Sequence, residues 1–211
     1  MLLLYNTDMR VLLFAIVVCL IPGAWLSATQ EASLPFGAEQ IRMKARMVIH
    51  EGESQISRTI EVLFDSSGTA GYRLLTQVIA PGFLRNMKVL VIDSGSDSTT
   101  WTSTSRGVRR IGSRGGSERV FQSDFFVGDF TGWQLAEYDH EGLVMAVDLA
   151  SEEDRPSREY RVLEIQTIDG QDFPKHVRMI TPSADTHTDL YLEKIDTSPQ
   201  FSPRSFNPAG L

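Results

Sequence analysis

The clearest pattern in the chain is the strict alternation of apolar and polar residues between Ile41 and Ile49. One side of this stretch carries Ile41, Met43, Ala45, Met47 and Ile49. A period of two is typical of a strand with one buried face. The run Arg58–Phe64 repeats the pattern and places Ile60, Val62 and Phe64 on one face. The polar stretch His50–Ser57 between the two runs contains Gly52 and is expected to be a hairpin turn.

Similar short runs follow along the rest of the chain, separated by turn residues such as Pro81–Gly82, Asp139–Gly142 and Asp169–Gly170. They predict further strands at 72–80, 87–92, 99–103, 108–111, 133–138, 143–149, 160–168, 175–180 and 188–195. Helical signals are few: a short helix over 29–40, and a turn of helix capped at Ser123–Asp124 that runs to about Phe130. The proline-rich stretch Ser198–Leu211 is expected to lie as an extended tail on the sheet edge.

About ten or eleven strands with short turns, and no alternation of strands with helices, predict a mainly β protein built on an antiparallel sheet. A sheet of this size must curl or fold over, and few helices are available to cover it. The expected fold is therefore a curled antiparallel sheet, an unclosed β-barrel, with few short helices. Its apolar concave face is either a lipid or acyl-chain site or the sealed core of a closed sandwich, and the pattern leaves both open.

The N-terminus carries the only long apolar run, Val11–Trp25. It is too short and too interrupted to span a bilayer comfortably, which takes about 20 residues. Arg10 precedes the run and the small residues Ser27 and Ala28 follow it, which is the order of a secretory signal. We expect residues 1–28 to be a cleaved signal peptide and 29–211 a single exported β domain. The alternatives are a retained N-terminal anchor and lipidation at Cys19.

Composition and charge narrow the function classes. The 211 residues carry a net charge of −7, which disfavours a wholly basic nucleic-acid binder. One cysteine cannot form an intramolecular disulfide or a thiolate metal site. No metal-ligand spacing relates the histidines, which are interpreted as surface or strand-edge side chains: His50, His140, His176 and His187. No spacing of a nucleophile and a base is visible, so neither an enzyme nor a cofactor or metal is expected.

Positive charge is concentrated between residues 106 and 119. Five arginines lie in this glycine- and serine-rich span, whose only acid is Glu118: Arg106, Arg109, Arg110, Arg114 and Arg119. The span is a candidate cationic loop for anionic lipid headgroups or an acidic partner. The alternative is structural, with Arg109 and Arg110 forming ion pairs with the nearby Asp124 and Asp129.

The stretch Trp101–Phe130, WTSTSRGVRRIGSRGGSERVFQSDFFVGDF, resembles the signature of the LolA-like outer-membrane lipoprotein-sorting family. The resemblance is carried by a tryptophan-led strand, an Arg-Arg-Ile step and a Ser-Asp-Phe segment, here Trp101, Arg109–Ile111, Ser123, Asp124, Phe125, Asp129 and Phe130. Pro81–Phe83 and the ending Phe206–Leu211 are similar to further features of that family. The resemblance implies the LolA/LolB-type fold, an unclosed β-barrel with a hydrophobic cavity, and periplasmic transfer of lipoproteins or other lipids toward the outer membrane.

On that resemblance we expect a periplasmic monomer that carries lipid or acylated lipoprotein between an inner-membrane transporter and an outer-membrane acceptor. An acyl chain gains about 0.8 kcal/mol per buried methylene, so such a cavity needs aliphatic lining and no catalytic group. The candidate lining residues, each of which is ordinary core in the alternative, are Met43, Met47, Ile60, Val62, Phe64 and Trp101. The alternative function is a non-catalytic periplasmic sensor or adaptor that binds a membrane-protein partner through the arginine-rich span.

Overall fold

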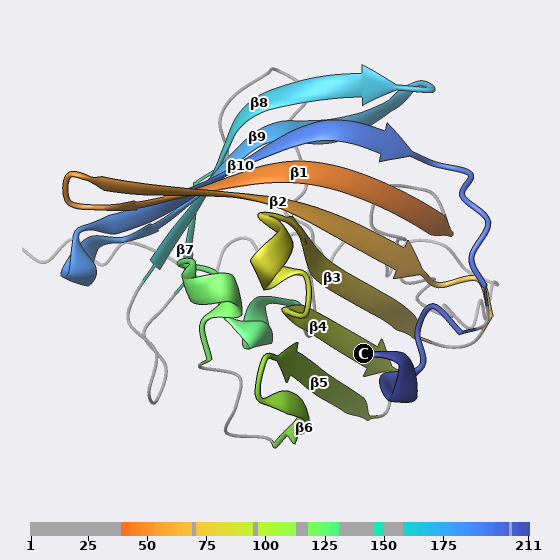
Figure 1. Ribbon diagram of the computed structural model, residues 1–211. Coiled ribbons are helices and arrows are strands. Elements are labelled where there is room, and N and C mark those ends of the chain that lie inside the picture. The colour runs from red at the N-terminus through yellow and green to blue at the C-terminus, as the bar shows by residue number, and fades with distance from the viewer. Residues whose placement is uncertain are drawn as a thin grey trace, which may run out of the picture. The chain divides into compact units, whose positions relative to one another are not determined.

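A computed structural model describes residues 39–68, 71–94, 97–112, 118–130, 146–149, 158–202 and 204–211 (Figure 1). The chain divides into two compact units, Met1–Ser33 and Leu34–Leu211, and all described residues belong to the second. The signal peptide predicted at 1–28 and the strand predicted at 133–138 lie outside the described residues. So does most of the helix expected at 29–40, whose last residue, Gln40, begins the first strand.

The second unit is built on one open, curled antiparallel sheet of ten strands, which confirms the predicted fold class. The strand order is β6-β5-β4-β3-β2-β1-β10-β9-β8-β7, so neighbours in the sheet are neighbours in the chain except where β1 pairs with β10. The sheet is therefore two meanders joined along that pair. The strands are β1 (Gln40–Glu51), β2 (Ser54–Asp65), β3 (Tyr72–Ala80), β4 (Lys88–Asp93), β5 (Ser98–Thr104), β6 (Gly107–Ile111), β7 (Ala146–Leu149), β8 (Arg158–Ile168), β9 (Gln171–Thr181) and β10 (Thr186–Asp196).

β1 shows how the alternation of the sequence becomes the two faces of the sheet. Its inward residues Ile41, Met47 and Ile49 are no more than 1% exposed, whereas the residues between them include the exposed Arg42 and Arg46. A buried apolar side chain contributes about 1.5–3 kcal/mol, and a slip of one residue would expose the whole set. The apolar pattern therefore determines both the inward face and the register of β1.

The hairpin turn between β1 and β2 is shorter than the predicted turn at 50–57. The strands pair as far as Glu51 and Ser54, which leaves Gly52 and Glu53 as the turn. Gly52 adopts a φ of 57°, which glycine tolerates without steric cost. The ladder continues through polar residues because backbone groups pair whatever their side chains are, and the hydrophobic pattern does not show this part of the strands.

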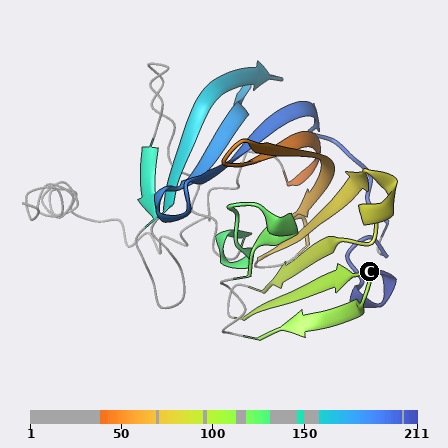
Figure 2. The same cartoon turned by 60° about the vertical axis from the view of Figure 1, so that its left-hand side comes forward.

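Each face of the sheet carries a hydrophobic core. The larger core lies on the inner face, the face toward which the sheet curls (Figure 2). The smaller core lies on the outer face and contains Leu63, Leu75, Leu90 and Phe206. Residues 63 and 64 of β2 belong to different cores, as expected for side chains that alternate across a sheet.

The C-terminal residues cover the outer core, which corrects the prediction that 198–211 lies on the sheet edge. Phe206 is 4% exposed and packs in this core, with Phe201 edge-on to it at a ring distance of 5.4 Å. The 3₁₀ turn η8 (Pro208–Gly210) ends the chain, and Lys88 Nζ donates to the Gly210 carbonyl at 3.3 Å. The tail takes this place because it removes apolar leucine surface of the outer face from water.

The turn of helix predicted from Ser123–Asp124 to about Phe130 forms only over its last four residues, as a 3₁₀ turn. Two 3₁₀ turns stand there, η5 (Val120–Gln122) and η6 (Val127–Phe130), because the Asp124 side chain binds threonines of other strands. The other described helices are the 3₁₀ turns η3 (Gly82–Leu84), η7 (Pro182–Ala184) and η8. No helix within the described ranges combines the length and apolarity needed to cross a membrane.

A buried carboxylate links β2 and β3 near the C-terminal tail. Asp65, which is 2% exposed, accepts hydrogen bonds from the backbone and hydroxyl of Ser67, from the Gln40 amide and from Arg73. The Arg73 guanidinium also lies 4.9 Å above the ring of Phe206. Burial acts to raise the pKa of Asp65, but the hydrogen bonds from Ser67 and Gln40 and the charge of Arg73 outweigh it. The pKa of Asp65 therefore lies below its usual value.

Replacing Asp65 with asparagine should lower the free energy of unfolding at neutral pH by about 1–3 kcal/mol, because the donors on Ser67, Gln40 and Arg73 lose their charged acceptor. A carboxyl whose pKa is lowered in the folded state stabilises the protein above its unfolded pKa of about 3.9. This contribution is lost as the pH falls through the folded value. Urea unfolding should therefore show a gap between wild type and Asp65→Asn at pH 7 that narrows below about pH 4. Asp97→Asn, at an exposed position, is the control, and a gap that does not change with pH would contradict the prediction.

Candidate functional site

The inner face of the sheet is the candidate binding surface. Four of the predicted lining residues, Met43, Met47, Ile60 and Phe64, are at most 6% exposed and belong to the inner core. Val62 is partly buried and packs against them. With Met179 of β9, three methionines lie in this core, and methionine repacks readily around partners of different shape.

Trp101 does not join these residues, so the prediction that all six line one surface is wrong. It packs against the outer core and pairs across the ladder with Leu90. β5 instead turns its buried residues Thr100 and Thr102 inward, opposite Val91 and Val89 of the inner core. The reason is strand parity: an odd-numbered residue of β5 faces the C-terminal tail.

One irregular segment, residues 118–130, covers the inner face; we call it the cover segment. Its apolar side chains are at most 4% exposed and pack into the inner core: Val120, Phe121, Phe125 and Val127. Figure 2 shows the segment (green) within the curve of the sheet. The segment folds back on itself, because the Val120 amide donates to the Phe125 carbonyl at 2.7 Å and the Val127 amide to the Glu118 carbonyl at 2.9 Å.

Asp124 fastens the cover segment to β9 and β10. Its carboxylate, in a residue only 1% exposed, accepts hydrogen bonds from the hydroxyls of Thr181, Thr186 and Thr188 at 2.5–2.7 Å. The Thr188 hydroxyl also accepts from the Asp124 backbone amide at 2.9 Å. We call this arrangement the Asp124 anchor. Hydrogen bonds to a charged group are about twice as strong as neutral ones, so the anchor fixes the segment in one position.

A second anchor joins the cover segment to β8. Arg158, 3% exposed, donates Nη1 and Nη2 to the two carboxylate oxygens of Asp129 at 2.6 and 2.7 Å. The same guanidinium donates to the Asp124 carbonyl at 3.0 Å and lies 4.3 Å above the ring of Phe126. A contact of this kind, with two parallel hydrogen bonds between arginine and carboxylate, fixes both the position and the orientation of the cover segment on β8.

The residues of the family-like motif thus act as structure of the cover segment. Ser123, fully buried, donates its hydroxyl to the Val120 carbonyl at 2.6 Å and accepts from the Phe125 amide at 3.2 Å. Asp124 and Asp129 form the two anchors, and Phe125 fills the inner core. Phe130 ends η6, and its side chain lies outside the described part of the structure.

The cover segment is strained next to these anchors. Phe121 and Gln122 both have a left-handed backbone, with φ of 53° and 63°. This conformation costs about 1–2 kcal/mol for each residue that carries a side chain. The burial of Phe121 and a 2.7 Å hydrogen bond from Arg58 Nη2 to Gln122 Oε1 hold the two residues in place.

Arg58 is a candidate functional residue that the sequence analysis did not single out. It is 4% exposed and pairs with Met47 across the β1–β2 ladder. Its Nε and Nη1 have no hydrogen-bond partner among the described residues. Burial lowers the pKa of Arg58, against the opposing charge of Glu51. The sequence contained a sign of this placement. Arg58 is spaced by even numbers of residues from Ile60, Val62 and Phe64 and so lies on the same face of the strand.

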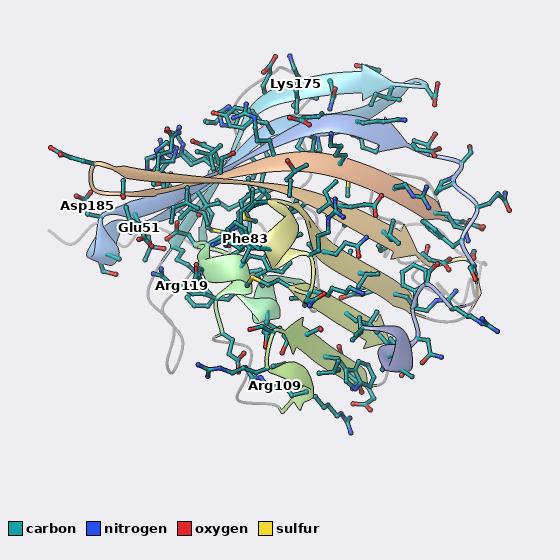
Figure 3. All side chains as sticks on the ribbon, in the orientation of Figure 1. Glu51, Phe83, Arg109, Arg119, Lys175 and Asp185 are labelled. Carbon is teal, nitrogen blue, oxygen red and sulfur yellow. The ribbon has the colours of Figure 1, made fainter. Side chains whose placement is uncertain are left out.

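The predicted cationic span is divided between two elements. Arg109 and Arg110 are exposed on β6, the outermost described strand on its side, and Arg106 is exposed just before it. Arg119 is exposed at the start of the cover segment, and Figure 3 shows Arg109 and Arg119 lying apart. Arg114 lies outside the described residues. Four of the five arginines thus face solvent, although they do not form one loop.

The ion pairs expected in the structural alternative for these arginines are wrong. Arg109 pairs with Glu118, and Arg110 Nη2 donates to the Thr99 hydroxyl at 3.1 Å. The carboxylates proposed as their partners are used elsewhere, Asp124 by three threonines and Asp129 by Arg158.

The outer face carries a polar cluster around Asp189, whose side chain is 1% exposed. Arg178 Nε and Nη2 donate to its two oxygens at 2.8 and 3.0 Å, and His176 Nε2 lies 2.8 Å from Oδ1. His50 Nε2 and His187 Nε2 lie 3.3 and 3.8 Å from Oδ2. All three histidines lie on strands and are partly exposed, and the sheet register brings them together from β1, β9 and β10, which their spacing along the chain did not predict.

The groups of this cluster shift the pKa values of Asp189 and His187. Burial acts to raise the pKa of Asp189, but hydrogen bonds from Arg178 and His176 lower it more, so it lies below its usual value. Burial, together with the charges of His50 and Arg178, lowers the pKa of His187. These directions are those of an ionised Asp189 beside a neutral His187.

The Asp124 anchor makes a testable contribution to stability. Thr188→Val should lower the free energy of unfolding by about 2–3 kcal/mol, because the carboxylate and the Asp124 amide both lose a buried partner. Thr102→Val is the matched control, since the buried Thr102 hydroxyl has no hydrogen-bond partner among the described residues and its replacement should be nearly neutral. Urea unfolding of both variants checks this, and equal losses would show that the anchor contributes nothing particular.

Comparison with known proteins concerns the fold. No family model and no curated protein matches the sequence. Among solved structures, a DUF1329 family protein from Desulfovibrio piger is similar with a TM-score of 0.72 and 15% identity, over 82% of this chain and 92% of that one. A putative outer membrane lipoprotein-sorting protein domain from Vibrio parahaemolyticus gives 0.67 and 12%, over 81% and 90% of the two chains.

A LolA superfamily protein from Nitrosomonas europaea is similar with a TM-score of 0.58 and 11% identity, over 85% of this chain and 94% of that one. Identities of 11–15% show the shared architecture and not a shared activity. The open, curled antiparallel sheet is the fold expected from the sequence resemblance. The chain therefore has the fold of the LolA-like lipoprotein-sorting proteins.

Proposed function

We propose that the protein is a non-catalytic periplasmic carrier of lipids or acylated lipoproteins, and that the inner face of the sheet receives the acyl chain. The observation that carries this proposal is a continuous apolar, methionine-containing face whose described cover is one irregular segment. A similar structure described as a putative outer membrane lipoprotein-sorting protein domain supports it. The signal pattern at 1–28 supports the periplasmic location.

An acyl chain can replace the cover segment on the inner face. Each methylene that it buries contributes about 0.8 kcal/mol, which offsets the apolar burial that the cover segment gives up. Release of Phe121 and Gln122 from the left-handed conformation also favours displacement of the cover segment. In the loaded state the displaced phenylalanines and valines pack against the acyl chain.

Arg58 adds a polar end to this apolar site. Its guanidinium is buried beside Met47, and two of its nitrogens are without partners in the described part of the protein. A planar guanidinium binds carboxylate or phosphate oxygens with good geometry. We therefore propose that the cargo combines an acyl chain with an oxygen-rich head, which replaces Gln122 as the partner of Arg58.

Two substitutions that enlarge side chains, one on each face of the sheet, test whether the inner face binds the acyl chain. Met47→Phe should weaken binding of a fluorescent fatty acid by about tenfold, because it occupies the inner face. Leu75→Phe enlarges a buried side chain on the outer face and should leave binding unchanged. Native mass spectrometry of the purified wild type should show bound lipid or acyl peptide. Equal binding by both variants, or neither lipid nor probe on the wild type, would refute the proposal.

The exposed arginines of β6 favour contact with an anionic membrane surface during loading. Each basic residue near such a surface contributes about 1 kcal/mol, so Arg106→Glu/Arg110→Glu should reduce co-sedimentation with anionic vesicles by at least about tenfold. Lys175→Glu/Lys194→Glu changes the net charge equally at exposed positions of β9 and β10 and is the control. If both pairs reduce vesicle binding to the same degree, net charge and not the β6 surface is responsible.

A further inference from the structure

Two histidines from different strands stack on the outer face, next to the carboxylate of Asp189. His50 of β1 pairs directly with His187 of β10, and their rings stack at a centroid distance of 4.1 Å and an angle of 12°. The pair lies near the tips of neighbouring hairpins, where Figure 3 labels Glu51 and Asp185. Both imidazoles are partly exposed, at 27% and 33%, so solvent reaches them.

Three possible metal ligands lie close together at this pair. One donor atom from each of His50, His187 and Asp189 lies within 4.8 Å of the other two. The distances from Asp189 Oδ2 to the two Nε2 atoms are 3.3 and 3.8 Å. Ligands bound tetrahedrally at about 2.0–2.1 Å lie about 3.3–3.4 Å from one another, so these distances are close to those of a metal site. The two rings must unstack to share an ion, because imidazoles in parallel planes cannot both direct an in-plane Nε2 lone pair at one point.

The remaining groups of the cluster hold the carboxylate in position. Oδ1 of Asp189 receives Arg178 Nε and His176 Nε2, both at 2.8 Å. His176 in turn stacks on Tyr191 at 4.2 Å, and Arg46 lies 4.2 Å above that tyrosine ring. Oδ2 is left facing the two histidines, with Arg178 Nη2 at 3.0 Å. Outer groups that orient a ligating carboxylate in this way are usual at metal sites.

We propose that His50, His187 and Asp189 bind one divalent transition-metal ion, with His176 and Arg178 as positioning residues. Two imidazoles and one carboxylate suit zinc, copper or nickel, and not magnesium or calcium, which prefer sites made of oxygen atoms. The guanidinium of Arg178 offsets the negative charge of Asp189. The site therefore depends mainly on its two imidazoles, which are ligands that transition metals prefer. Because the imidazoles are exposed, water or a further ligand completes the coordination. This site is on the face opposite the proposed acyl site and does not depend on it.

Isothermal titration of the chelator-treated full chain with zinc sulfate tests the site. The wild type should bind one equivalent, and His50→Gln or His187→Gln should weaken binding by at least about tenfold. Glu193→Gln, which removes an exposed carboxylate on the same face of β10, should leave affinity unchanged, as should Met47→Phe in the acyl site. No binding by the wild type, or equal affinity in the histidine variants, would overturn the proposal.

A spectroscopic measurement on the unaltered protein covers the case in which a histidine variant does not fold. One equivalent of copper(II) should give an electron paramagnetic resonance spectrum with splitting from two imidazole nitrogens. A spectrum of aqueous copper, or of copper bound to backbone nitrogen, would exclude the proposed site.

Discussion

A buried carboxylate that accepts from three threonine hydroxyls holds the cover segment on the inner face of the sheet. An ionised carboxyl removed from water costs several kcal/mol unless hydrogen bonds satisfy it, and Asp124 receives them from Thr181, Thr186 and Thr188. The three hydroxyls come from the adjoining ends of β9 and β10, so only the completed hairpin can accept the cover segment. Two of the aromatic rings that seal the inner face, Phe121 and Phe125, are carried by the same short segment. The Asp124 anchor therefore helps to keep the apolar face covered by the protein's own chain.

Opposing forces act on the cover segment. The two anchors hold it down, while the left-handed backbone at Phe121 and Gln122 stores energy that displacement would release. Arg58 contributes to both effects, because it holds Gln122 and has two nitrogens without a partner in the described part of the chain. The proposed carrier function would need such a balance: a permanently sealed core could not accept cargo, and an uncovered one would expose apolar surface to aggregation.

Adjacent residues of β10 serve two separate regions of the molecule. Thr188 points inward to the Asp124 anchor, and Asp189 points outward to the histidine cluster. The strand period of two makes this possible, because one residue along the chain changes the face. The proposed acyl site and the proposed metal site can thus be altered independently, although they share a strand.

Local pattern and tertiary packing determined different parts of this protein. The alternation of apolar and polar residues was enough for the strands, the mainly β class and the burial of Met43, Met47, Ile60 and Phe64, because a period of two is a property of each strand alone. It did not predict the face of Trp101, the place of the C-terminal tail, the partners of Asp124, or the meeting of His50, His176 and His187. These depend on register and on the β1–β10 pairing, which joins residues more than a hundred positions apart. No local pattern records such pairings, because their energy comes from contacts that exist only once the strands have paired in this order.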